Sequence, residues 1–411
     1  MDAHQVMLAQ QQRTIRILAL AQVLNGLGVA GTVAAGSLLV SSITDSETLA
    51  GLAQTSSVLG AAALAIPLAR LTARGGRRLA LSVGYLSGVL GSILAIIGGS
   101  SKLLPFMLIG TFFVGAASAA GYQARFAAID LASDDHRARH LSFVVWGLTI
   151  GAVIGPNLMD PSGRLAELLG LPHLVGPYLI STVTLLLSTL VIQFFLKPDP
   201  YLTARTLRGE AGSERREIKR ALRHIAENSR ALFAILAIST GHIAMVTIMV
   251  MTPVHMKHVD VTLTIIGLVI SIHVLGMYAF SPLVGSLSDR IGRINTIRIG
   301  VLTLLIASFV AGRAHADDAI QLGIGLFLLG LGWSFTLIAG STFLTESVTQ
   351  ELKASAQGAS DLVMNLSGAF GGAIAGVVIA TLSYGWLCAL AAIPVSLLGI
   401  WSLRVVKANR N

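Results

Sequence analysis

Residues 319–344 read AIQLGIGLFLLGLGWSFTLIAGSTFL, a run without a charged side chain. At 1.5 Å per helical residue, about twenty such residues cross a hydrocarbon layer of about 30 Å, so the run predicts a transmembrane helix. The whole chain has the same character, because 54% of its 411 residues are hydrophobic and only 12% are charged. This composition disfavours a water-soluble enzyme and predicts an all-α integral membrane protein.

Similar apolar runs recur on both sides of this one and give twelve predicted transmembrane helices. The first six are Thr14–Ile43, Thr48–Leu68, Leu79–Gly99, Leu103–Gln123, Leu141–Leu158 and His173–Leu196. The second six are Ala231–Pro253, Leu263–Pro282, Ile294–Gly312, Ala319–Leu344, Gly358–Thr381 and Leu387–Leu403. We expect two six-helix bundles, at residues 1–196 and 231–411, joined by a polar linker at residues 197–230.

The basic residues predict how the chain is oriented in the membrane. If the linker and both termini are cytoplasmic, all but four of the 29 Lys and Arg residues lie inside, the exceptions being Lys102, Arg164, Lys257 and Arg313. This distribution follows the positive-inside rule, and we expect the plasma (inner) membrane of a bacterium. The net charge of +9 therefore sets topology and does not indicate a nucleic-acid partner.

The linker and the single cysteine carry little further information. Residues 214–230 have the periodicity of an amphipathic helix, which is consistent with a helix on the inner membrane surface and equally with a solvated connector. Cys388, the one cysteine, lies in an apolar run, so no disulfide framework is predicted.

The two halves resemble each other in sequence. When the second half is laid on the first without a gap, Gly292-Arg293 falls on Gly76-Arg77 and Glu346 falls on Asp130. A parallel duplication of six helices, with a substrate cavity between the halves, is a known way to build a carrier that works by alternating access.

Between the predicted eighth and ninth helices lies Gly285-Ser-Leu-Ser-Asp289-Arg290-Ile-Gly292-Arg293. This segment resembles the G-x-x-x-D-R-x-G-R loop of the major facilitator superfamily, and with the twelve spans and the duplication the resemblance covers essentially the whole chain. It implies that Asp289, Arg290 and Arg293 make charge contacts with neighbouring helix ends that break during transport. The alternative is a basic loop that only fixes topology.

Two further segments bear on this resemblance. The N-terminal copy of the loop has Ala69 and Ala73 where the pattern has Gly and Asp, so a gating role for this copy is in doubt. In the fifth span, residues 151–156 (GAVIGP) resemble an element of proton-coupled antiporters in the superfamily. Two glycines and a proline also serve close helix packing and bending, so this element is weak support for export.

Soft metal ligands recur at helical spacing in the seventh and eighth spans. His242, Met245 and Met249 share one helix face, and His273 and Met277 lie one turn apart. The segment after the seventh span adds His255, Met256 and His258, which we interpret as a metal entry path. Thioether and imidazole groups together favour Cu(I), although packing is the usual role of such methionines.

The paired patterns M-x-x-x-M and H-x-x-x-M on consecutive helices resemble those of the CcoA-like copper importers within the superfamily. This resemblance implies that Met245, Met249, His273 and Met277 are copper ligands. The same gapless alignment of the halves places Val29, Val33, Ser57 and Ala61 at the corresponding positions of the first half, so the soft ligands belong to one half only.

Other polar residues in the spans suggest a coupling site. Asp361 and Asn365 lie one turn apart in the inner part of the eleventh span, where Asp361 could carry a coupling proton or make a structural hydrogen bond. Arg125 and Asp130, at the inner end of the fourth span, are interpreted as anchors of that end.

Three functional hypotheses remain open. The first is a secondary transporter that imports copper, and the second is a proton-coupled exporter of small organic compounds. The third is a membrane sensor without turnover. No G-x-x-x-x-G-K-[ST] loop is present, which disfavours ATP-driven transport by this chain. We expect a monomeric transporter in the lipid bilayer, not an enzyme, without a cofactor and with copper as cargo.

Overall fold

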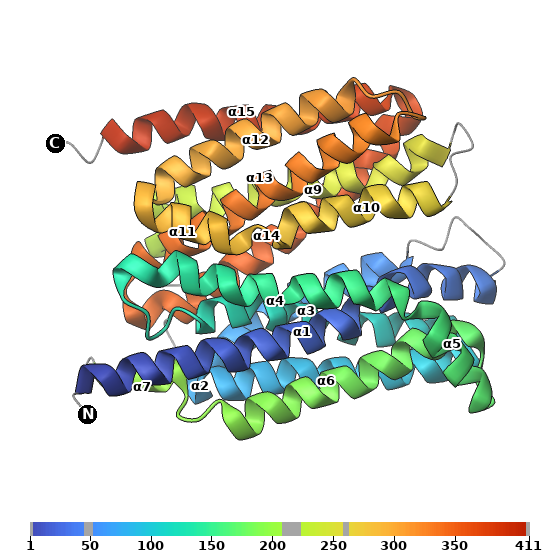
Figure 1. The fold of residues 1–411 in the computed structure, drawn as a ribbon, viewed down its shortest axis with the longest axis horizontal. Coiled ribbons are helices and arrows are strands. Elements are labelled where there is room, and N and C mark those ends of the chain that lie inside the picture. Colours follow the sequence, from blue (N-terminus) through green and yellow to red (C-terminus); the bar gives the residue numbers. More distant parts are fainter. Residues whose placement is uncertain (1–2, 45–51, 208–222, 258–262, 408–411) are drawn as a thin grey trace. The chain divides into compact units, whose positions relative to one another are not determined.

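The computed structural model describes residues 3–44, 52–207, 223–257 and 263–407 (Figure 1). Every regular element in these ranges is a helix, which confirms the predicted all-α fold. The helices before the linker are α1 (Ala3–Thr44), α2 (Leu52–Ser100), α3 (Leu104–Ala127), η1 (Asp134–His136), α4 (Arg137–Asn157), α5 (Met159–Leu168), η2 (His173–Val175), α6 (Gly176–Phe195) and α7 (Pro200–Leu207). The later ones are α9 (Ser229–Lys257), α10 (Leu263–Tyr278), α11 (Ser281–Ile291), α12 (Arg293–Gly312), α13 (Ala319–Glu346), α14 (Gln350–Thr381) and α15 (Tyr384–Lys407).

Among the described residues, eleven helical stretches are long and apolar enough to cross a membrane. One of them, α2, has 49 residues, about twice what a bilayer requires. It contains two spans that meet at Gly76, where φ is 83° and ψ is 178°. A side chain would strain this conformation, so glycine allows the turn between the second and third spans. The described helices thus supply the twelve predicted spans.

The same turn recurs in the second half. Gly292, with φ 88° and ψ 157°, separates α11 from α12. Gly76 and Gly292 are paired by the gapless alignment of the halves, so the two halves share this backbone feature as well as sequence.

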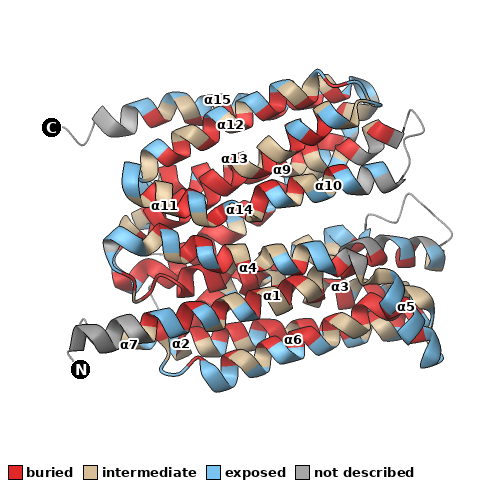
Figure 2. Cartoon of the chain, viewed as in Figure 1, coloured by how far each residue is buried: buried red, intermediate tan, exposed pale blue. Residues whose placement is uncertain are grey.

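Burial differs between helices in the way a membrane bundle requires (Figure 2). In the apolar stretch of α13, 78% of the residues are buried, against 33% in that of α15. Exposed positions on the outer helices are themselves apolar, such as Phe370 (62% exposed) and Leu397 (62% exposed). Such a surface would be a liability in water and suits contact with lipid.

Contacts divide the chain into two compact units. The first comprises residues 1–133, 143–217 and 357–362, and the second comprises residues 134–142, 218–356 and 363–411. Each unit therefore includes a short segment from the start of the fifth or eleventh span of the other half. The predicted division of the chain at a linker of residues 197–230 stays a prediction.

Some predicted boundaries were wrong. The eighth predicted span, Leu263–Pro282, is two helices, because α10 ends at Tyr278 and α11 begins at Ser281 with Pro282 in its first turn. Helix α14 begins at Gln350, eight residues before the predicted start. The short helices α5 and α7 fall in segments that the sequence predicted as connections.

The linker helix predicted for residues 214–230 is only partly covered. Residues 214–222 lie outside the described residues, whereas residues 223–227 are helical. Asn228 then begins the next helix by accepting hydrogen bonds from the backbone N–H groups of Arg230 and Ala231.

Candidate functional site

The predicted gating loop, residues 285–293, comprises the last turns of α11, the turn at Gly292 and the first residue of α12, all in the second unit. Asp289 accepts hydrogen bonds from the backbone N–H groups of Ala138 (3.2 Å) and Arg139 (2.9 Å), in the first turn of α4. Because a helix N-terminus has unsatisfied N–H groups and partial positive charge, this carboxylate is an effective cap. Arg293 pairs with Asp289 (2.6 Å) and with Glu346 at the end of α13 (2.9 Å). The loop therefore joins three helix ends.

The remaining residues of the loop differ in their surroundings. A Cβ on Gly285 would stand 2.5 Å from the carbonyl oxygen of Ala138, so only glycine allows α11 to approach α4 this closely. Gly292 is needed for its positive φ. Arg290 is exposed. Its predicted gating role stays a prediction, as do those of the other loop residues.

In the N-terminal copy of the loop, the corresponding arginine, Arg77, also forms an ion pair with a carboxylate. Arg77 donates to both carboxylate oxygens of Asp130, at 2.8 and 3.1 Å. Arg77 and Asp130 are 53 residues apart, as are Arg293 and Glu346. The duplication thus preserves an ion pair between the start of one span and the end of the next.

A buried network extends from Arg77 within the first unit. Gln123 accepts from Arg77 (3.1 Å) and donates to Asp361 (3.0 Å), and Asp361 also pairs with Arg125 (2.5 Å). Gln357 accepts from Arg77 as well (2.7 Å). Asp130 pairs with Arg77 and Arg125 pairs with Asp361, so both residues that the sequence suggested as anchors of the fourth span are held by ion pairs. Their role as anchors stays a prediction.

Network residues come from α2, from α3 and the turn that follows it, and from the first part of α14. The side chains of Arg77, Asp130, Arg125 and Asp361 are all 1% exposed or less. Removing charges from water is costly, and each of the four is compensated by an opposite charge. Asn365, predicted with Asp361, lies one turn further along α14 and is buried.

In the seventh span, His242 lies between two other helices of the second unit. Its Nδ1 accepts a hydrogen bond from the indole N–H of Trp333 on α13 (3.1 Å). Its imidazole edge faces Gly368 on α14, where a Cβ would stand 2.7 Å from Nε2. Since Nδ1 accepts, a neutral His242 carries its proton on Nε2, which leaves no ring nitrogen free to bind a metal.

In the eighth span, His273 is fully buried and differently arranged. Its Nδ1 lies 2.8 Å from the carbonyl oxygen of Leu326 on α13, an acceptor that requires a proton on Nδ1. The neutral ring therefore has a lone pair on Nε2, and this buried atom has no hydrogen-bond partner within the described part of the chain. Met277, one turn along, is buried against Gly330 of α13.

The two helices that carry the predicted ligand pairs pack against the same third helix. Helix α13 packs against both α9 and α10, and Trp333 of α13 contacts His242 on one of them and Tyr278 on the other. Met245 is buried in α9 and Met249 is partly exposed. The described residues contain no cluster of three or more His, Cys, Asp or Glu side chains suited to a metal ion.

The predicted metal entry segment is part of a helix. His255 and Met256 lie in the last turn of α9, whereas the sequence predicted a connecting segment there. The His255 ring stacks on Tyr384 of α15 (centroids 4.3 Å apart), and Met256 is fully buried. The Tyr384 hydroxyl also forms a hydrogen bond with the Thr252 hydroxyl (2.8 Å). His258 lies outside the described residues.

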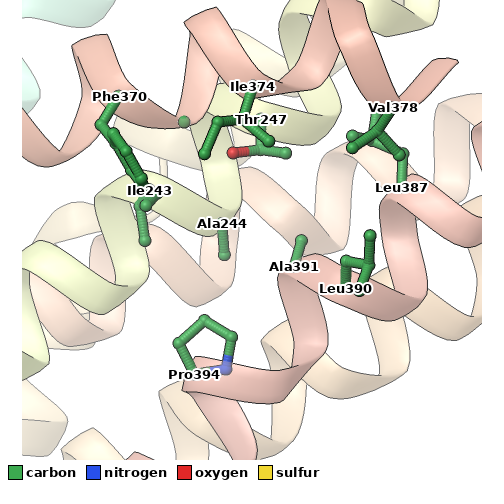
Figure 3. Close-up of a pocket in the computed structure, with 11 residues that line it drawn as sticks. Ile243, Ala244, Thr247, Phe370, Ile374, Val378, Leu387, Leu390, Ala391 and Pro394 are labelled. Atoms are coloured by element: carbon green, nitrogen blue, oxygen red, sulfur yellow. The ribbon is translucent and has the colours of Figure 1, made fainter. Parts of the chain in front are cut away.

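An apolar cavity of about 120 Å³ opens between α9, α14 and α15 (Figure 3). Figure 3 shows the ring of Phe370 at one end and Val378 with Leu387 at the other. Thr247 contributes a hydroxyl group to a lining that is otherwise apolar. None of the predicted ligands lines this cavity, and its exposed residues Phe370, Ile374 and Leu390 belong to the apolar outer surface. It is therefore a crevice on the lipid side.

Sequence reasoning assigned no role to three residues that organise these sites. Trp333 contacts two helices, Gln123 joins the two ion pairs, and Asp199 bonds to the N-terminal loop. A polar side chain inside an apolar span was the available signal for Gln123 and Trp333. Asp199 had a weaker signal, an acidic residue directly before Pro200, which is the pattern of a capped helix start.

Comparisons with known proteins agree with this architecture. The chain is 36% identical over 400 residues to the uncharacterised MFS-type transporter YdeG of Bacillus subtilis, covering 95% of this chain and 92% of YdeG. It is 26% identical to the riboflavin transporter RfnT of Brucella anthropi, covering 86% and 85% of the two chains. The solved proton:xylose symporter XylE has the same fold, with a TM-score of 0.74, 16% identity and 96% of both chains covered.

The family profile is decisive, because it covers nearly the whole chain. The profile described as Major Facilitator Superfamily matches residues 18–260 and 237–410. With twelve spans, a duplicated loop and relatives along its full length, this chain belongs to the major facilitator superfamily of secondary transporters.

Proposed function

We propose that this chain is a proton-coupled transporter of a small organic solute, with Asp361 as the carboxylate that binds and releases the proton. One observation carries the proposal. The Asp361 carboxylate lies in a membrane span, is 1% exposed, and is held by Arg125 and Gln123. Ionisable residues are expensive within a membrane and are by default functional.

A proton on Asp361 would affect more than one helix. It would cancel the charge of the carboxylate and weaken its bond to Arg125. Gln123 would transmit the change, because its amide nitrogen donates to Asp361 and its amide oxygen accepts from Arg77. Contacts on α2, α3 and α14 would loosen together, which suits a carrier whose conformational equilibrium is biased by a proton.

An organic solute is supported by polar groups in the first unit. Asn25 of α1 is 3% exposed, and its amide oxygen has no hydrogen-bond partner among the residues that the structure describes. Nearby, Gln22 donates to the carbonyl oxygen of Gly121. A buried acceptor without a partner costs free energy, so a solute that donates a hydrogen bond would be favoured there. The likeness to a riboflavin transporter points to the same class of solute.

Transport into proteoliposomes tests this proposal, with riboflavin as the first solute and sugars and other heterocyclic compounds after it. We expect solute movement to carry protons, read by a pH-sensitive dye inside the vesicles. Asp361→Asn should retain exchange of labelled for unlabelled solute and lose accumulation driven by a pH gradient. Asp160→Asn is the matched control, since this exposed carboxylate pairs with Arg164 outside the network.

Two results would contradict the proposal. Proton movement of normal size in Asp361→Asn would exclude Asp361 as the proton site. Solute transport by the parent protein that ignores the pH gradient would exclude proton coupling.

Copper import is the second candidate, and His273 favours it. An imidazole whose Nδ1 donates to a backbone carbonyl presents Nε2 in the orientation typical of metal-binding histidines. Met277 on the same helix offers a thioether, so the two groups suit Cu(I). Copper ranks second because His242 is engaged by Trp333 and the relatives named above give no support for a metal cargo.

Uptake of Cu(I) into cells distinguishes the two candidates. If copper is the cargo, Met245→Leu combined with His273→Ala should abolish accumulation while the amount of protein in the membrane stays normal. Normal copper uptake by this double variant, together with solute-driven proton movement, would leave the organic solute as the cargo.

The remaining features follow from the family and the basic residues. We expect a monomer in the bacterial inner membrane, with the linker and both termini in the cytoplasm, and no bound cofactor. Copper, if transported, would be cargo.

A further inference from the structure

The N-terminal copy of the loop, residues 69–78, forms a hydrogen bond with a residue that lies outside it. Asp199 follows α6 and precedes α7, and its Oδ2 accepts a hydrogen bond from the backbone N–H of Arg78 (2.7 Å). Its Oδ1 accepts from the backbone N–H groups of Tyr201 (3.0 Å) and Leu202 (3.1 Å), at the start of α7. One carboxylate therefore caps two helix starts, those of the third span and of α7.

Further contacts join α7 to the same loop. Arg205, near the end of α7, donates to the carbonyl oxygen of Ala73 (3.4 Å). The ring of Tyr201 lies 5.6 Å from the guanidinium carbon of Arg77 and is buried. These contacts all lie within the first unit. The contacts at Ala73 and Arg78 lie on either side of Arg77 in the sequence. Arg77 in turn donates hydrogen bonds to Asp130, Gln123 and Gln357.

The two copies of the loop can be compared at their glycines. Gly76 and Gly292 have nearly the same φ, 83° and 88°. A Cβ on Gly76 would stand 2.5 Å from the carboxylate of Asp199, whereas a Cβ on Gly292 would meet no atom of the described residues within 4 Å. The carboxylate of the second loop is its own Asp289, while the first loop has Ala73 at the corresponding position.

We propose that Asp199 is the positioning residue of the N-terminal loop: it replaces the carboxylate that the loop has lost, fixes α7 to the start of the third span, and thereby holds Arg77 in the buried network. The contacts of the first loop then remain within its own unit. Asp289 is the loop carboxylate that binds the start of α4. This inference does not depend on the identity of the solute.

Hydrogen exchange on the full chain in lipid nanodiscs tests the double cap. We expect Asp199→Ala to accelerate exchange at least about tenfold both in the first turn of the third span and in the first turn of α7. Asp318→Ala is the matched control, because Asp318 caps only α13, by accepting from the backbone N–H of Gln321. The control should accelerate exchange at the start of α13 alone.

Every outcome of this experiment decides the question. Acceleration confined to one of the two segments would make Asp199 an ordinary helix cap and overturn the proposal. Unchanged exchange in both segments would overturn it as well.

A thermal-unfolding cycle provides an independent measurement. Gly76→Ala and Gly292→Ala impose the same backbone strain, but only the first also collides with Asp199. We expect Gly76→Ala to lower Tm more than Gly292→Ala, and the excess to disappear when Asp199→Ala is present in both. Equal effects of the two glycine substitutions in the parent protein would contradict the proposal, as would an excess that persists without the Asp199 carboxylate.

Discussion

Arg77 makes several polar contacts inside the protein, which a basic residue that only sets topology would not need. Its guanidinium is fully buried and donates to both oxygens of Asp130, to Gln123 and to Gln357. We predict that Arg77→Ala lowers the free energy of unfolding by about 3–5 kcal/mol, because it leaves the Asp130 carboxylate buried without its partner. Chemical denaturation in mild detergent measures the effect.

Asp130→Ala in the Arg77→Ala background is the control for this prediction. The second substitution removes the stranded charge, so it should recover part of the lost stability. A double variant as unstable as the sum of the two single variants would contradict the interpretation of an ion pair. The equivalent Arg293→Ala should cost less, because the side chains of Arg293 and Glu346 are 11% and 21% exposed.

The sequence predicted which residues of this network correspond in the two halves, but not how they pair. Position along the chain places Arg125 and Asp130 at the inner end of the fourth span, so both were interpreted as anchors of that end. The true partner of Arg125 is Asp361, 236 residues away, and no local pattern specifies such a contact. The tautomer of His273 was likewise beyond prediction, because it is set by a carbonyl group on α13.

At the scale of elements, the GAVIGP segment of the fifth span acts through packing. A Cβ on Gly151 would stand 2.5 Å from the backbone nitrogen of Leu27 and 2.6 Å from the Cα of Gly26, both on α1. Backbone atoms cannot move aside as side chains do. We predict that Gly151→Ala costs about 1–3 kcal/mol of stability and reduces the yield of monodisperse protein on size exclusion.

Gly372→Ala provides the comparison for Gly151→Ala. The nearest atom to a Cβ at Gly372 is Cγ1 of Val246, at an ordinary 3.7 Å, so this helical glycine has room for a methyl group. Equal tolerance of the two substitutions would show that α1 and α4 do not approach closely in the membrane.

Asp289 joins the ends of α11, α12 and α4, and its substitution should affect rate more than binding. It accepts from two backbone N–H groups and from Arg293. Asp289→Asn retains the shape and loses the charge, so we predict turnover reduced about tenfold with substrate affinity nearly unchanged. Ala73→Asp should have little effect, because Asp199 already supplies a carboxylate to that loop. Turnover and dissociation constants, measured separately, check both, and a rise in Kd that matches the loss in rate would contradict the gating role.

The sequence predicted the spans well and their interruptions poorly. Long apolar runs determine where helices cross a membrane, so the positions of α3, α6, α12 and α13 agree closely with prediction. The short helices α5 and α7 lie in polar segments, where hydropathy has no signal. The break between α10 and α11 occurs inside an apolar run, and Pro282 was the local indication of it.

For the molecule as a whole, the duplication was the most informative sequence feature. Laying one half on the other aligned Gly76 with Gly292 and Arg77 with Arg293, and the structure has the same turn and the same kind of ion pair at both places. The duplication does not reveal which substrate the protein carries. The residues that the halves do not share, among them His273, Asp361 and Asp199, are where the chain departs from its own symmetry and where function is to be sought.

The orientation of the whole chain is the last prediction. All but four of its 29 Lys and Arg residues lie in the termini, inner loops and inner helix ends that we assign to the cytoplasmic side. Moving such charges across a membrane is costly, so their distribution fixes the topology. A phosphatase reporter, active only outside the cytoplasm, should be inactive when fused after Arg208 and active near Asp317, and a cytoplasmic fluorescent reporter should give the reverse. An active phosphatase after Arg208 would invert both bundles and place the Asp289 and Asp199 contacts on the outer face.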